Sequence, residues 1–197
     1  MAAALELFVE KGFVGTRLDD VAARAGVSKG TLYLYFDSKE ALFLAMVRDA
    51  LVTPMRSLQE LITQHPDDSA TQLLTTLMHG WWSRVRSERY GVIARLVIGE
   101  LHQFPELVEA YNVEVIARGR AALADIIRHG ISTGEFRPIE PRTAARMIAS
   151  MAVANGLWAS HRTLFTEMAD QSDDDVVDAI VDFSLAALRA PASASTR

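Results

Sequence analysis

The sequence contains no cysteine among its 197 residues, which excludes disulfide bonds, thiol redox sensing and thiolate metal sites. It also lacks alternating strand patterns, internal repeats and a glycine-rich phosphate loop. Apolar runs are short at the start of the chain, where Glu6, Glu10 and Lys11 interrupt them. We therefore predict neither a signal peptide nor a membrane span, and we expect a cytoplasmic protein.

The spacing of a metal-dependent helical enzyme is missing as well. Metal centres in helical bundles use a Glu-x-x-His motif, in which both side chains share one helix face. No acidic residue stands three positions before any of the five histidines, which are His65, His79, His102, His129 and His161. We therefore predict that the protein is not an enzyme and that it holds no metal and no cofactor.

The charge has to be considered locally. A net charge of −5 argues mildly against nucleic acid as a partner when it is taken over the whole chain. Residues 27–36, however, contain one lysine and no acidic residue, and a partner meets a surface rather than a total charge. Few cations release few counterions, so DNA binding here should show modest affinity and modest salt dependence.

The most informative stretch is a pair of short helices around Gly26. Residues 18–25 form an amphipathic pattern, and glycine at position 26 is suited to the left-handed conformation of a helix stop. Ser28 is a suitable N-cap for a second helix over residues 28–35. Two short helices joined by a glycine-containing turn predict a helix-turn-helix, whose second helix enters the DNA major groove.

The residues around this motif resemble the DNA-binding domain of tetracycline-repressor (TetR) type regulators over about positions 3–47. The matching segments are Phe13-Val14-Gly15-Thr16, Val21-Ala22, Ala25-Gly26-Val27-Ser28-Lys29-Gly30-Thr31-Leu32-Tyr33, Tyr35-Phe36 and Ser38-Lys39-Glu40-Ala41-Leu42. A looser resemblance over Leu96–Tyr111 points to the regulatory domain of one large subgroup of that family. Such regulators usually carry a short basic segment ahead of the first helix, and the sequence leaves open whether this protein has one.

The resemblance implies a homodimeric transcriptional regulator that binds a palindromic, double-stranded DNA operator and is released by a small-molecule inducer. It implies a repressor, with an activator as the alternative. A helical DNA-binding protein that responds to no ligand is another alternative. The residues expected to contact DNA are Thr16, Arg17, Ser28, Lys29, Gly30, Thr31, Tyr33, Tyr35 and Lys39.

The rest of the chain also follows a helical pattern, because apolar residues recur every three or four positions. We predict an all-α fold of about nine helices. Local signals place helix starts at Ser38, Pro105, Pro141 and Asp173, through serine capping, proline in the first turn and acidic residues at the positive end of the helix dipole.

Three parts are predicted along the chain. Residues 1–47 form the helix-turn-helix domain, residues 48–189 form the ligand-binding and dimerisation domain, and residues 190–197 form a disordered tail. The helix that follows Ser38 is shared by the first two parts. Pro54 either bends this helix at a hinge for induction or merely ends it near the surface.

The last two predicted helices are apolar over most of their circumference, or lined with small residues that permit close approach. Two such helices from each subunit would form a four-helix interface. The alternative is a large core within a single chain. The predicted interface residues are Ala149, Val153, Gly156, Val177, Ile180, Val181, Ser184 and Leu188.

The resemblance also implies a pocket for an inducer in the body. We expect this inducer to be partly apolar, because ligand pockets between helices are mostly apolar with a few oriented polar groups. The alternative is that the aromatic residues are ordinary core and the polar groups ordinary surface. The predicted ligand-binding residues are Trp81, Trp82, His102, Phe104, Tyr111, Asn155 and Trp158.

Overall fold

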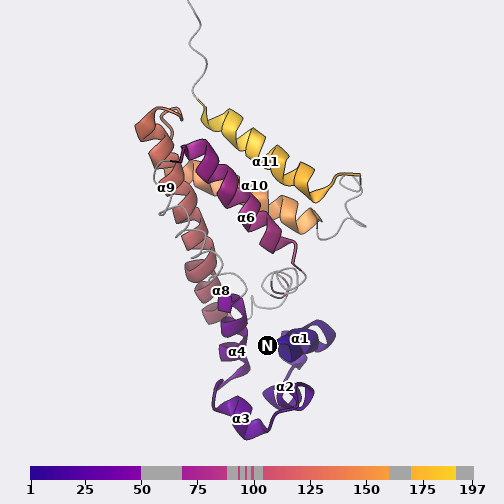
Figure 1. Cartoon of the computed structure of the whole chain (residues 1–197). Helices are drawn as coiled ribbons and strands as arrows, with labels where there is room; N and C mark the ends of the chain where they lie inside the picture. Colours follow the sequence, from indigo (N-terminus) through magenta and orange to yellow (C-terminus); the bar gives the residue numbers. More distant parts are fainter. Residues whose placement is uncertain are drawn as a thin grey trace, which may run out of the picture. The chain divides into compact units, whose positions relative to one another are not determined.

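The computed structural model describes residues 1–49, 68–87, 104–159 and 170–189, together with Ile93, Leu96 and Gly99. The regular elements in these ranges are all helical, which confirms the all-α prediction (Figure 1). Extended backbone pairing among the described residues is limited to one isolated β-bridge, between Phe136 and Arg189. None of the described helices is both long and apolar enough to cross a membrane.

Contacts divide the chain into two compact units. The first comprises Met1–Arg56 and Ser87–Ala117, and the second comprises Ser57–Arg86 and Arg118–Arg197. The boundary predicted after residue 47 stays a prediction, as does the tail at 190–197, which lies outside the described residues together with Pro54.

The first unit packs its helices around an aromatic cluster. Its elements are α1(Ala2–Gly15), α2(Leu18–Ala25), α3(Lys29–Tyr33), α4(Lys39–Val47), α8(Pro105–Tyr111) and the π-helix η3(Asn112–Ala117). The rings of Phe8, Phe13 and Phe43 lie 5.4 to 6.0 Å apart, and Phe104, at the start of α8, lies 5.0 Å from Phe13. Each such pair adds about 0.5–1.5 kcal/mol beyond the area it buries, so this cluster fixes the elements that carry the helix-turn-helix.

One detail of α1 differs from the sequence-based prediction. The apolar pattern places Val9 on the buried face with Phe8, but Val9 is 57% exposed, whereas Leu7 and Phe8 are buried. The helix is also interrupted at Gly12, where φ is +71°. Because the direction of the chain changes at Gly12, Phe13 reaches the core without continuing the periodicity of the preceding turns.

A charged pair joins α4 to η3. The Arg48 guanidinium donates to both carboxylate oxygens of Glu114, at 2.7 and 2.6 Å. This hydrogen bonding raises the pKa of Arg48 and forms the paired geometry that guanidinium and carboxylate groups favour. The sequence predicts one helix over Pro105–Thr133. The structure shows an uninterrupted helical run there, in which η3 separates α8 from the α-helix α9(Arg118–Thr133).

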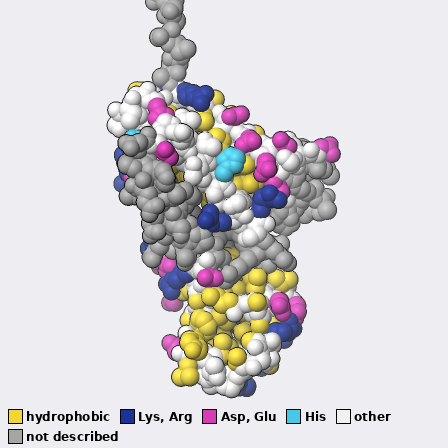
Figure 2. All heavy atoms as spheres, viewed as in Figure 1, with side chains coloured by type: hydrophobic (Ala, Val, Ile, Leu, Met, Phe, Trp, Pro, Cys, Tyr) yellow, Lys and Arg dark blue, Asp and Glu magenta, His cyan; other side chains and the backbone are white. Residues whose placement is uncertain are grey.

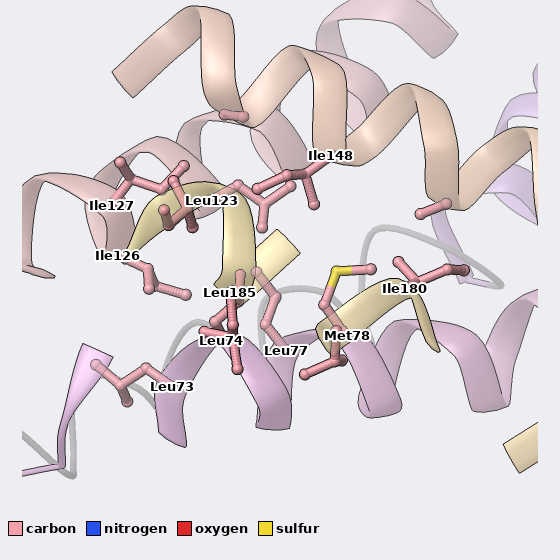
Figure 3. Packing of buried hydrophobic residues seen from close by; sticks show 14 of the residues in the cluster. Leu73, Leu74, Leu77, Met78, Leu123, Ile126, Ile127, Ile148, Ile180 and Leu185 are labelled. Carbon is pink, nitrogen blue, oxygen red and sulfur yellow. The ribbon is translucent and has the colours of Figure 1, made fainter. Parts of the chain in front are cut away.

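The second unit consists of α6(Ala70–Val85), α9, α10(Pro141–Ala159) and α11(Asp173–Leu188). Ser69 and Ser172 cap α6 and α11 in reciprocal capping boxes, which satisfy backbone donors that a helix start leaves free. Apolar side chains from all four helices point toward one another in the core (Figure 3). The helix starts predicted at Ser38, Pro105, Pro141 and Asp173 are confirmed.

The turn after α9 is fixed by backbone contacts. Gly134 has φ of +78°, a conformation that favours glycine. The following residue, Glu135, accepts hydrogen bonds from the backbone N–H groups of Ala70 and Thr71 at 2.7 and 3.1 Å. The carboxylate therefore caps α6 and ties its start to this turn.

Candidate nucleic-acid interface

The turn between α2 and α3 has the geometry predicted from the sequence. Gly26 adopts φ of +69°, and its N–H donates to the carbonyls of Ala22 and Ala23 at the end of α2. The Ser28 side chain accepts from the N–H of Thr31 at 3.0 Å, which confirms Ser28 as the N-cap of α3. The helix stop, the turn and the new cap are therefore all encoded locally.

Residues 26–30 also spell Gly-x-Ser-x-Gly, the letters of a hydrolase nucleophile elbow. That motif requires a strand before the serine and a helix after it. Here α2 precedes Ser28, and the serine oxygen is used as a helix cap. The surroundings of Ser28 therefore match a helix-turn-helix, and they do not match the setting of a catalytic serine.

The inner side of the motif packs into the first unit. Leu18, Val21 and Ala22 from α2 and Leu32 from α3 are buried in the same cluster as the three phenylalanine rings. Phe36, four residues after Leu32, packs against that cluster as well. Since residues four apart share one helix face, Leu34, midway between them, lies on the opposite side.

The outer side of α3 presents the predicted contact residues. Lys29, Gly30 and Thr31 are exposed, and Tyr33 and Tyr35 are 46% and 77% exposed. Hydrophobic side chains gather over the first unit on the face shown in Figure 2.

Sequence reasoning missed Leu34, which is 84% exposed. The spacing of Leu32 and Phe36, four residues apart, was the signal that could have placed Leu34 on the outside.

Most basic side chains of residues 1–49 form ion pairs or hydrogen bonds within the chain. Arg24 binds Glu6 and Glu10, Lys11 binds Asp20, and Arg48 binds Glu114. The ammonium of Lys29 lies 2.5 Å from an Asp19 carboxylate oxygen, and this hydrogen bond raises the pKa of Lys29.

Arg17 is different. It is exposed at the N-cap of α2, and no ion pair or hydrogen bond of its guanidinium falls within the described residues. Among the basic side chains of residues 1–49, Arg17 is therefore the exposed one whose charge is not paired within the described part of the chain.

Two predicted DNA contacts have internal roles in this structure. Thr16 is 1% exposed, and its hydroxyl donates to the carbonyls of Leu7 and Gly12. The Lys39 ammonium donates to the carbonyls of Phe13, Val14 and Thr16 at 2.9 to 3.3 Å. In the free chain both side chains therefore stabilise the end of α1, and their assignment as DNA contacts stays a prediction.

The predicted ligand-binding residues fall in both units. Trp81 and Trp82 on α6 have ring centroids 6.2 Å apart, and Trp82 is 2% exposed with no hydrogen-bond partner for its indole N–H among the described residues. Asn155 donates to the carbonyl of Met151 at 2.9 Å, and Trp158 is 42% exposed.

Two of the other three residues of this set lie in the first unit. Phe104 and Tyr111 pack against the core of the first unit, and His102 lies outside the described residues. The predicted pocket stays a prediction.

Most predicted interface residues lie inside the single chain. Five of these residues have side chains that are at most 5% exposed, namely Val177, Ile180, Val181, Ser184 and Leu188. Gly156 is also buried. This side of α11 packs on α6 and α10 of its own chain, and the assignment of these residues as subunit contacts stays a prediction.

Large apolar side chains nevertheless remain exposed on α10 and α11. Met147 is 55% exposed, the predicted interface residue Val153 is 47% exposed, and Phe183 is 67% exposed. Ala149 is half-buried and packs against the core. Exposed apolar residues on both helices leave a surface there that another protein surface could cover.

Metal-binding groups do not cluster in the described part of the chain. No group of three His, Cys, Asp or Glu side chains there is arranged to hold an ion. Polar side chains there instead form pairs between helices, such as His79 with Asp178 at 3.1 Å and Arg86 with Asp173 at 2.5 Å. These pairs connect α6 to α11.

Two family models match the sequence. The model of the tetR family of bacterial regulatory proteins matches residues 1–46, and the model of the C-terminal domain of AefR-like transcriptional repressors matches residues 72–190. The uncharacterized HTH-type transcriptional regulator YdeS of Bacillus subtilis is 30% identical over 143 residues, which cover 70% of this chain and 65% of that protein. RutR of Escherichia coli K12 is 46% identical over 63 residues, 30% of each chain. The matched region thus spans less than two thirds of the length of either relative.

Solved structures share the fold over nearly the whole chain. The transcriptional regulator FadR from Bacillus subtilis, in complex with stearoyl-CoA, has a TM-score of 0.77 at 22% identity and covers 94% of this chain and 96% of its own. NalD, the secondary repressor of the MexAB-OprM multidrug efflux pump in Pseudomonas aeruginosa, has a TM-score of 0.75 at 21% identity, over 95% and 93% of the two chains. At this level of identity the similarity shows the fold.

Proposed function

Because this chain belongs to the tetR family of bacterial regulatory proteins, we propose that it is a homodimeric, ligand-responsive regulator that binds a palindromic operator and represses transcription in the cytoplasm. The observation that carries this proposal is the exposed outer side of α3. This helix directly follows a turn in which Gly26 is left-handed and Ser28 caps the new helix. An activator that uses the same surface is the alternative. We assign the chain no catalytic reaction.

The exposed groups on α3 suit recognition in the major groove. Gly30 has no side chain, so the backbone can approach the DNA closely. Thr31 can exchange hydrogen bonds with a base edge and place its methyl against thymine. The phenol groups of Tyr33 and Tyr35 can donate to phosphates. Lys29 has to leave Asp19 to reach a phosphate, so its contribution to affinity is the difference between two ion pairs.

The dimer is proposed to form through the exposed sides of α10 and α11. Met147, Val153 and Phe183 supply apolar area there, and burying it favours association. A two-fold dimer places its two recognition helices about 34–36 Å apart, one turn of DNA, so the operator is expected to be a palindrome. Phe183→Asp should give monomers that still fold, whereas Ile180→Asp would disrupt the core of the single chain instead.

The inducer is proposed to be a partly apolar molecule with an oxygen acceptor. Trp82 supports this, because its buried indole N–H is a donor without a partner in the described part of the chain, and leaving such a group unpaired costs about 1–3 kcal/mol. Among the structural relatives, FadR is seen in complex with stearoyl-CoA and SmeT in complex with triclosan. Both of those ligands combine apolar area with oxygen atoms.

Coupling of the inducer to DNA is proposed to pass through the Arg48–Glu114 pair. It ties α4 to η3, and π-helical turns within longer helices often mark functional positions. A ligand that favours a different winding of this run would move Glu114 and release Arg48. The ligand does so only if it binds the two states with different affinity.

The experiment is an electrophoretic mobility shift on a duplex selected from a random library, with and without an extract of cell metabolites. The proposal predicts a sequence-specific shift that a component of the extract reverses, and mass spectrometry of the bound fraction identifies that component. Binding without sequence preference or ligand response would instead indicate a nucleoid-type or protein-interaction bundle. Thr31→Ala should weaken the shift by about 1–3 kcal/mol per lost contact while the dimer persists.

A further inference from the structure

Leu34 is the most exposed of the large hydrophobic side chains that the structure describes, at 84%. A single exposed leucine is ordinary. Leu34, however, continues the helical geometry of α3, because its backbone is right-handed helical and its N–H donates to the carbonyl of Gly30 at 3.1 Å. It therefore lies one helical turn after Gly30 and Thr31, on the face proposed to enter the major groove.

The chemistry of a leucine limits what it can recognise there. Its side chain neither donates nor accepts a hydrogen bond, so it gains nothing from a phosphate or from a polar base edge. The one apolar group that a base pair presents in the major groove is the 5-methyl group of thymine. Cations contribute little beside it, since Lys29 is held by Asp19. Apolar contact is therefore the interaction this position can offer to DNA.

Resting on the proposed function, we propose that Leu34 is a specificity-determining residue that contacts the methyl group of one thymine in each operator half-site. It makes that position of the operator a T·A pair by packing against the methyl rather than by hydrogen bonding. The contact also removes the leucine side chain from water, which is favourable in itself. Recognition by Leu34 thus adds an apolar element to the polar contacts of Thr31.

The test uses an operator duplex selected by the wild-type dimer from a random library. Each thymine is replaced in turn by deoxyuridine, which removes the methyl group and keeps the hydrogen-bonding edge. Fluorescence anisotropy should show one thymine per half-site at which the replacement weakens wild-type binding, by roughly four-fold per half-site for one buried methyl. Leu34→Ala should show a comparable or larger loss on the original duplex and no further loss with deoxyuridine at that position.

Controls separate this contact from folding. Urea unfolding of Leu34→Ala should match wild type, because the side chain is exposed. Val14→Ala, which changes a valine that is 58% exposed at the end of α1, should keep the wild-type response to deoxyuridine. The inference is overturned if no deoxyuridine replacement affects wild-type binding, or if Leu34→Ala keeps the full response. Failure to select any duplex would overturn the proposed function and this inference with it.

Discussion

The substitution Gly30→Ala isolates the approach of α3 to DNA. In the free protein, a Cβ at position 30 would have the Ser28 side-chain oxygen as its nearest neighbour, at 3.8 Å, which is ordinary van der Waals contact. The residue is helical, and alanine is favoured over glycine in a helix by up to about 1 kcal/mol. The free energy of unfolding should therefore stay the same or rise slightly.

The effect on DNA binding should have the opposite sign. If the backbone of α3 contacts the DNA, the added methyl has to fit into a packed interface, and overpacking typically costs about 1–3 kcal/mol. This corresponds to a loss of roughly 5- to 150-fold in affinity for each half-site. Anisotropy titrations with a labelled operator measure the affinity, and urea unfolding measures the stability of the same samples.

Gly99→Ala is the matched control. Gly99 is also helical and exposed, and a Cβ at this position would meet no heavy atom of the described residues within 4 Å. The residue lies outside the helix-turn-helix, so the substitution should leave operator affinity unchanged. If Gly30→Ala binds the operator within about two-fold of wild type, the backbone of α3 does not approach DNA, and the proposed docking of this helix is wrong.

Four further outcomes are expected. Arg17→Gln should lower the slope of log K against log salt by about 0.9 per half-site in anisotropy titrations, because one phosphate contact is lost; an unchanged slope would exclude Arg17 as that contact. Asp19→Asn should tighten operator binding and steepen the same slope, since Lys29 no longer has an internal partner; weaker binding would contradict this. Lys39→Met should reduce the free energy of unfolding, measured by urea denaturation, by about 2 kcal/mol, because three carbonyls lose a charged donor. Wild-type stability of this variant would refute the structural role of Lys39. For Glu135, burial raises the pKa of the carboxyl, but hydrogen bonds from the start of α6 outweigh burial, so the net shift of the pKa is downward. The carboxylate therefore stabilises the fold fully above its ordinary pKa near 4.5, and this stabilisation is lost as the pH falls through the lowered value. Glu135→Gln should abolish that part of the dependence of the unfolding free energy on acid pH.

Local signals allowed much of the fold to be predicted from the sequence. Gly26, Ser28 and Ser38 were placed correctly because a left-handed stop or a side-chain cap depends on residues within four positions. The same holds for the proline at position 141. Gly26 and Ser28 determine where α2 ends and α3 begins, and with them the outer side of the motif.

Tertiary contacts limited the rest. Thr16 and Lys39 are polar residues beside the motif. No local sequence pattern shows that their side chains donate hydrogen bonds to carbonyls of α1. For Ile180 and Val181, the apolar circumference of α11 could not show which side packs on its own chain and which side is left for another subunit. The interface expected from the sequence therefore fell largely on the inner side of the helix.

The proposed function requires that the outer side of α3 reads a specific, two-fold symmetric DNA sequence. The most direct test is to measure the affinity of the purified protein for a duplex selected from a random library and for a scrambled duplex of the same composition, at one salt concentration. We expect a palindromic selected sequence that is bound at least about 10³-fold more tightly than the scrambled one, with this preference reduced in Thr31→Ala. Equal affinity for the two duplexes would contradict it.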